Sequence, residues 1–104
     1  MKSVNELKAK QDSIASNWTF LTNHLHAILC LHRKEETTVR NLAVQIGVTE
    51  RSVQRILNEL VDAGAITRER EGRTNSYTID YNYRLRHKLE KNHTIGELLE
   101  LLKE

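Results

Sequence analysis

The sequence is short of the residues that cross-link a chain, break its helices or anchor it in a membrane. It has one cysteine, no proline, four glycines and 5% aromatic residues. Cys30 alone cannot form an internal disulfide, which fits a reducing compartment. No run approaches the ~20 apolar residues that a spanning helix needs, and residues 1–6 lack the apolar core of a signal peptide. We therefore expect a cytoplasmic protein whose helices begin and end at capping residues and glycines.

A strong charge of either sign is also missing. Lysine and arginine number 16 against 14 aspartate and glutamate, a net charge of +2, so composition alone points to no partner. A length of 104 residues, 38% hydrophobic and 29% charged, suits one domain with one modest core. Any electrostatic surface for a partner must come from where the charges lie.

The first third of the chain predicts two helices. Ser3 and Glu6 have the spacing of a capping box, which opens a polar helix that runs to about Ile14. A second helix begins at Asn17 and ends at the charged run 33–36. Its apolar stripe recurs at helical spacing and consists of Trp18, Leu21, Leu25, Ile28, Leu29 and His32.

The middle of the chain predicts a short strand followed by two helices. Residues 37–39 have the composition of a strand, and a brief helix over 40–46 ends at Gly47. Thr49 is a good N-cap for a longer helix that runs to about Ala63, and the glycine after it closes that helix.

The last third predicts a hairpin and one more helix. Two β-like runs, 66–71 and 76–81, are joined by Gly72-Arg73-Thr74-Asn75, in which the glycine and the asparagine tolerate turn geometry. A capping box from Thr94 to Glu97 opens a last helix through Leu102.

This order of elements is that of a winged helix-turn-helix, a mainly α fold with a small β-hairpin wing and helical extensions at both ends. We expect a single domain over residues 1–104. It divides into an N-terminal helix in 1–16, a winged-helix core in 17–81 and a C-terminal helical extension in 82–104.

Residues 39–58 carry the pattern of the helix-turn-helix itself. Ala43 is small where the two helices cross, and Gly47 stands at the turn, where positive φ costs glycine nothing. An ordinary helical hairpin with a glycine in its turn is the alternative. The positions where the two helices meet are apolar: Leu42, Ile46, Val48, Val53 and Ile56.

The outward face of the second helix favours DNA over mere solvation. Arginine pairs with guanine, and glutamine and asparagine pair with adenine. Glu50 is the exception, and it either caps the helix or accepts from a cytosine amine. With the N-cap, the predicted DNA contacts of this helix are Thr49, Arg51, Ser52, Gln54, Arg55 and Asn58.

The hairpin adds a second set of predicted DNA contacts. Strand alternation puts its arginines on one face and Glu69 and Glu71 on the other. A salt-bridged, solvated hairpin is the alternative for the first two arginines, less so for the one at the tip. The set consists of Arg68, Arg70, Arg73, Thr74 and Asn75, which suit phosphates or the minor groove.

Six stretches, which together span about residues 18–102, carry a residue pattern typical of one family: 18–24, 47–56, 63–64, 72–77, 85–87 and 94–99. The pattern resembles the small MarR-like winged-helix regulators of prokaryotes. The resemblance implies a DNA-binding fold and dimerisation, and it implies no known ligand or target. Arg84 and Lys88 stand where that group often has proline, which would allow the tail to continue as helix there.

No residue pattern indicates catalysis, a cofactor or a metal. The sequence has no phosphate-binding glycine loop, nucleophile elbow or Ser-His-Asp pattern, so we expect no enzyme and no cofactor. His24 and His26 point to different sides of a helix, so surface or interface histidines are expected rather than a metal site. A small-molecule effector, if one exists, would have to bind between the core and the terminal helices.

The terminal helices are the expected elements of a homodimer. A symmetric dimer would place two recognition helices ~34–36 Å apart and match a palindromic site on double-stranded DNA. The alternative function is a winged helix that docks a protein and does not bind DNA. The predicted dimer interface consists of Trp18, Ile95, Leu98, Leu99 and Leu102.

Overall fold

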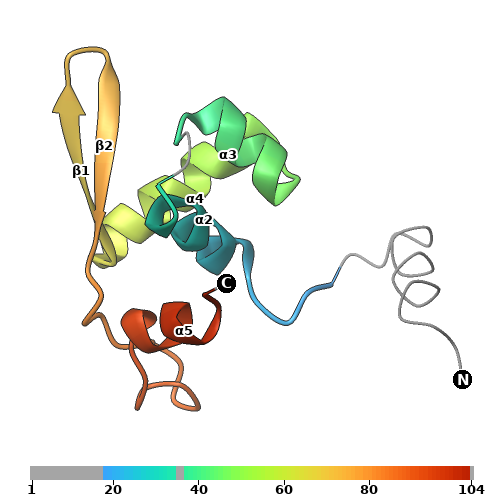
Figure 1. Ribbon diagram of the computed structural model, residues 1–104, viewed down its shortest axis with the longest axis vertical. Helices are drawn as coiled ribbons and strands as arrows, with labels where there is room; N and C mark the ends of the chain where they lie inside the picture. The colour runs from blue at the N-terminus through green and yellow to red at the C-terminus, as the bar shows by residue number, and fades with distance from the viewer. Residues whose placement is uncertain (1–17, 35–36, 104) are drawn as a thin grey trace, which may run out of the picture.

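The computed structural model describes residues 18–34 and 37–103, which form a winged helix-turn-helix (Figure 1). The predicted helix from Ser3 to Ile14 lies outside the described residues. The elements are α2 Asn23–His32, α3 Val39–Ile46, α4 Glu50–Ala63, β1 Ile66–Glu71, β2 Thr74–Ile79 and α5 Ile95–Leu101.

Both ends of α4 are set by local chemistry, as the sequence predicts. The Thr49 hydroxyl accepts a hydrogen bond from the Ser52 amide at 3.0 Å, which satisfies one of the free amides of the first turn. Gly64 ends the helix in the left-handed conformation, with φ of 85°. Gly47 has φ of 86° and turns the chain between α3 and α4. The predicted helix-turn-helix is therefore confirmed.

The predicted start of the second helix and the predicted strand over 37–39 are wrong, both because a threonine acts as a helix cap. α2 begins at Asn23 and not at 17, since the Thr22 hydroxyl accepts from the Leu25 amide at 3.3 Å. Residues 37–39 form no strand. Instead the Thr38 hydroxyl accepts from the Asn41 amide at 3.1 Å and starts α3. A cap fixes the first turn, whereas an apolar pattern fixes only which face is buried.

The hairpin has a tighter turn than predicted. β1 pairs antiparallel with β2 up to Glu71 opposite Thr74, so the connection is the two residues Gly72 and Arg73. Gly72 has φ of 62°, which allows a two-residue turn. β2 therefore begins at Thr74 and ends at Ile79, two residues earlier at each end than predicted. Asn75 lies in the ladder and not in the turn.

One hydrophobic core joins the three helices, the base of the hairpin and α5. Figure 1 shows the hairpin extending away from the helices, with α5 on the side of α2 away from α3. Each described helix contributes buried apolar residues to this core. The core consists of Leu25, Ala27, Ile28, Leu31, Leu42, Ala43, Val53, Ile56, Leu57, Leu60, Ala65, Ile66, Ile79, Ile95 and Leu99.

The tail between the hairpin and α5 is a loop of turns and does not continue as helix. Arg84 forms an isolated antiparallel bridge with Thr94, and the Leu85 amide donates to the His93 carbonyl at 3.0 Å. Because these backbone groups are hydrogen-bonded across the loop, they cannot form the hydrogen bonds of a helix, although the segment has no proline. The Thr94 hydroxyl then accepts from the Glu97 amide at 3.2 Å and starts α5, as predicted.

Gly96 is the position where α5 needs a hydrogen in place of a side chain. Its amide donates to the Tyr81 carbonyl at 2.9 Å, and an added Cβ would lie 2.9 Å from that same oxygen. Alanine in an open helix position would stabilise by roughly 0.5–1 kcal/mol. Gly96→Ala is instead expected to destabilise by about 1–3 kcal/mol, because the backbone oxygen cannot move aside cheaply.

Urea unfolding of Gly96→Ala beside Glu100→Ala tests this expectation. Glu100 is exposed on the same helix, and its substitution is expected to change the free energy of unfolding by less than about 0.5 kcal/mol. A stabilised Gly96→Ala protein would contradict the packing of α5 against Tyr81.

Candidate nucleic-acid interface

α4 presents one apolar face to the core and a polar face to solvent. Four apolar side chains, spaced three and four residues apart, are buried as the sequence predicts. The opposite face carries the longer of the polar side chains that are predicted to contact DNA. Its exposed residues include Arg51, Gln54, Arg55 and Asn58.

Thr49 and Ser52 have a role at the start of α4 whether or not DNA is bound. Besides accepting from the Ser52 amide, the Thr49 hydroxyl donates to the Ser52 hydroxyl oxygen at 3.0 Å. Glu50 is the acidic residue of the first turn, where the helix dipole favours a negative charge. A phosphate contact from either hydroxyl stays a prediction.

Arg51 and Gln54 are the side chains best placed to contact bases. They lie three residues apart, so they are neighbours on the exposed face of the helix. Within 18–34 and 37–103, neither side chain makes a hydrogen bond or ion pair with another residue. Their donor and acceptor groups are therefore available for base edges.

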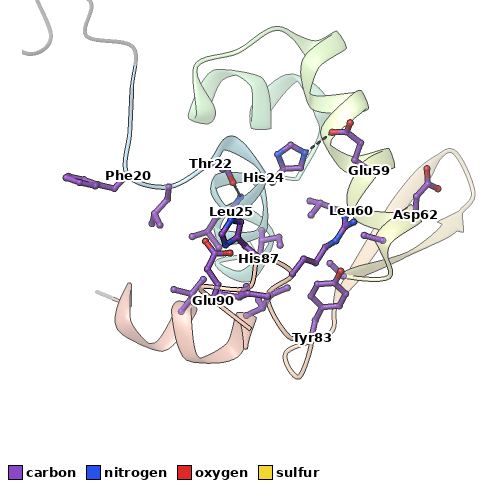
Figure 2. Close-up of a pocket in the computed structure, with 18 of the residues that line it drawn as sticks. Phe20, Thr22, His24, Leu25, Glu59, Leu60, Asp62, Tyr83, His87 and Glu90 are labelled. Atoms are coloured by element: carbon purple, nitrogen blue, oxygen red, sulfur yellow. Dashed lines mark hydrogen bonds and ion pairs between the residues drawn. The ribbon is translucent and has the colours of Figure 1, made fainter. Parts of the chain in front are cut away.

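Arg55 is held by neighbours that the sequence analysis missed. Its guanidinium donates to Glu59 at 3.1 Å, and the same carboxylate oxygen lies 2.7 Å from His24 Nε2 on α2 (Figure 2). The four-residue spacing of Arg55 and Glu59 is a sequence signal for such a pair. His24 is 35 residues from Glu59, and no local pattern could have brought them together.

The hydrogen bond with His24 is the largest of the effects that lower the pKa of Glu59 below its ordinary value of 4.5, and Arg55 adds to it. The pair therefore stabilises the fold above the ordinary pKa, and this contribution is lost as pH falls through the lower, folded value. In His24→Ala, the pKa of the Glu59 carboxyl is expected to rise toward 4.5, as measured by NMR titration.

Glu97 provides the control within the same spectra. Its pKa is lowered in the same way, by a hydrogen bond with His93, and His24→Ala is expected to leave it in place. An unchanged Glu59 titration in His24→Ala would contradict the contact between α2 and α4.

The wing residues fall into three groups. Arg68 Nη2 donates to Asn58 Oδ1 of α4 at 2.7 Å, and Arg70 donates to the Gly72 carbonyl at 3.0 Å. Arg73 is exposed in the two-residue turn, at the tip. Thr74 donates to the Glu71 carbonyl at 3.0 Å and, like Asn75, is exposed at the start of β2.

The alternative interpretation of the hairpin requires ion pairs between its arginines and its glutamates. In the described part of the chain, no arginine of the wing forms an ion pair with a glutamate of the wing. Glu71 instead accepts from the Ser76 hydroxyl at 3.2 Å. The arginines therefore keep their charge available on the wing.

Comparison with known proteins bears on the same segment. The MarR family model matches residues 22–72, from the N-cap of α2 to the turn of the wing. These residues form a MarR family domain. The match contains the whole helix-turn-helix and β1, so it includes the surface of α4 described above. No curated protein and no solved structure matches the chain.

MarR family domains such as the one in residues 22–72 are those of DNA-binding transcriptional regulators, which are not enzymes. Across residues 18–34 and 37–103, no cluster of three or more histidine, cysteine, aspartate or glutamate side chains could hold a metal ion. In the same residues, no helix combines the length and the apolar character needed to cross a membrane.

The residues predicted for a dimer interface separate into buried and accessible ones. Ile95 and Leu99 are 3% and 2% exposed, because α5 directs them into the core of its own chain. Leu98 and Leu102 are half-buried. Trp18 is 66% exposed and packs edge-to-face on Phe20, with 5.0 Å between ring centroids. Ile95 and Leu99 are thus unavailable to a second MarR chain, and the dimer itself stays a prediction.

A cleft lies between α2, α4 and the C-terminal segment (Figure 2). It has a volume of about 1260 Å³, and its walls include Leu25, Leu60 and Leu98 beside the charged Arg55 and Glu59. It lies where the sequence analysis places any effector, between the core and the terminal helices. That an effector binds here stays a prediction.

Proposed function

We propose that this MarR protein binds double-stranded DNA sequence-specifically as a homodimer and thereby regulates transcription. The observation that carries the proposal is the pair Arg51 and Gln54, exposed and unengaged among the described residues on the outer face of α4. An α-helix fits the major groove, where arginine reads guanine and glutamine reads adenine with two hydrogen bonds each.

The wing supplies contacts that position the protein without reading sequence. Arg73 at the tip lies at the end of the hairpin that Figure 1 shows extending from the helices. An arginine there can bind a phosphate with two hydrogen bonds or enter a narrow minor groove. The exposed Asn75 beside it can donate to the same backbone, and Thr74 can do so once its hydroxyl proton leaves the Glu71 carbonyl.

The homodimer would pair the accessible apolar residues near the two ends of the described chain. Trp18, Leu98 and Leu102 remain from the predicted interface, and Phe20 and Leu101 are 91% and 81% exposed. Large apolar side chains at such exposure are typical of a surface that a partner covers. We treat residues 1–104 as one domain whose terminal parts serve this contact. A regulator of this kind would work in the cytoplasm, beside the DNA.

Selection from a random pool of DNA duplexes tests sequence reading and dimerisation together. The proposal predicts an enriched palindrome with half-sites about 10 base pairs apart, because each recognition helix reads one half. Sedimentation at micromolar concentration is expected to show a dimer. A monomer there, or a selected site without two-fold symmetry, would contradict the homodimer. A pool without any enriched sequence would contradict sequence reading.

A further inference from the structure

The wing is attached to the body of the protein only near its base. Ile66 and Ile79, which pair at the start of β1 and the end of β2, are buried, whereas the rest of β1 is exposed. Tyr77 is half-buried and packs against the core. A two-stranded ribbon held mainly at one end can change its angle to the helices. The tip contacts DNA in a fixed register only if something sets that angle.

A side-chain hydrogen bond joins the exposed part of the wing to α4. Arg68 Nη2 donates to Asn58 Oδ1 at 2.7 Å. The Arg68 guanidinium also lies over the ring of Tyr77, its partner across the ladder, with 5.9 Å to the ring centroid. Of the side-chain hydrogen bonds among the described residues, the one between Arg68 and Asn58 is alone in linking the hairpin to α4.

This contact changes what both residues can do on DNA. An asparagine reads adenine with two hydrogen bonds, one of which is accepted by its carbonyl oxygen. That oxygen of Asn58 already accepts from Arg68, which leaves it one lone pair and ties its side-chain amide to the wing. The Arg68 guanidinium in turn is drawn toward Asn58 and Tyr77, away from the tip of the wing where Arg73 lies. The pair is engaged within the protein before DNA arrives.

We propose that Arg68 and Asn58 are positioning residues that fix the angle between the wing and α4, rather than direct contacts to DNA. This inference rests on the proposed function, because the angle matters only if α4 and the tip bind one duplex together. The brace, as we name the Arg68–Asn58 contact, aligns Arg73 with Arg51 and Gln54. It replaces the prediction that Arg68 and Asn58 touch phosphate and base.

A double-mutant cycle in DNA binding tests the brace. Asn58→Ala and Arg68→Ala are each expected to weaken binding to the selected site about tenfold, and the double variant no more than either alone, since both break one contact. Asn58→Ala is expected to lower affinity without altering the preference at any single base pair. Arg68→Lys, which keeps a donor, is expected to recover part of the affinity.

Salt dependence separates the brace from a phosphate contact. Loss of one phosphate contact lowers the slope of log affinity against log salt by about 0.9, whereas loss of the brace leaves it unchanged. The control is Thr78→Ala, an exposed neighbour of Tyr77 on the other face of β2, which is expected to bind as wild type. Additive losses with a reduced slope in Arg68→Ala, or a changed preference at one base pair in Asn58→Ala, would overturn the inference.

A measurement without DNA tests the brace independently of the proposed function. Residual dipolar couplings of the hairpin amides are expected to fit the same alignment as those of α4 in the wild type, and to shrink in Asn58→Ala. Unchanged couplings in Asn58→Ala would contradict the brace even if the protein binds DNA. Shrunken couplings in a protein that binds no DNA would contradict the proposed function alone.

Discussion

Alanine at Gln54 is expected to weaken binding to the selected DNA site by about 5- to 150-fold and to leave binding to random duplexes almost unchanged. A side chain that reads a base with two hydrogen bonds contributes about 1–3 kcal/mol of discrimination. Gln54 is uncharged, so its loss removes no attraction to phosphate. The measurement is a titration of both DNA types by fluorescence anisotropy, and Arg51→Ala is expected to relax the sequence preference in the same way.

Arg73→Ala is the matched comparison, because it removes a charge from the wing tip and no group from α4. Its affinity is expected to fall for all sequences alike, and the salt slope is expected to fall by about 1. If Gln54→Ala and Arg73→Ala lowered affinity for specific and random DNA equally, the division between reading by α4 and anchoring by the wing would be wrong.

Alanine at Ile56 is expected to destabilise the domain by about 2–5 kcal/mol. Ile56 is 1% exposed and lies on the buried face of α4, in the core shared by all the helices. Small domains are stable by about 5–15 kcal/mol, so this loss is a large fraction of the total. Urea unfolding followed by circular dichroism measures it.

Val44→Ala is the control for Ile56→Ala, since Val44 is 75% exposed on α3. It is expected to change the free energy of unfolding by less than about 0.5 kcal/mol. A cost below about 1 kcal/mol for Ile56→Ala would show that the inner face of α4 is not packed as described.

The parts of the fold that the sequence predicts well are those fixed within a few residues. The Thr49 hydroxyl accepts from the Ser52 amide and starts α4, and Gly64 ends the same helix. Both ends of α4 could therefore be predicted from local chemistry alone. The start of α2 shows where two local signals compete. An apolar pattern reaches back to Trp18, but the Thr22 cap decides the first turn.

What the sequence could not predict depends on residues that meet only after folding. Arg68 was expected on DNA, and in the structure it donates a hydrogen bond to Asn58 of α4, ten residues earlier in the chain. Ile95 and Leu99 were expected at a dimer interface, and α5 packs them into its own core. In both cases the sequence predicts a side chain that is available to a partner, and the tertiary structure engages that side chain within the same chain.

The salt dependence of binding to duplex DNA tests the central claim most directly. Each phosphate that the protein neutralises releases counterions, so log affinity is expected to fall linearly with log salt, with a slope of about −0.9 per phosphate contact. The wild type is expected to show a slope of several units. Absence of binding at low salt, or binding that does not depend on salt, would contradict it and favour a winged helix that docks a protein.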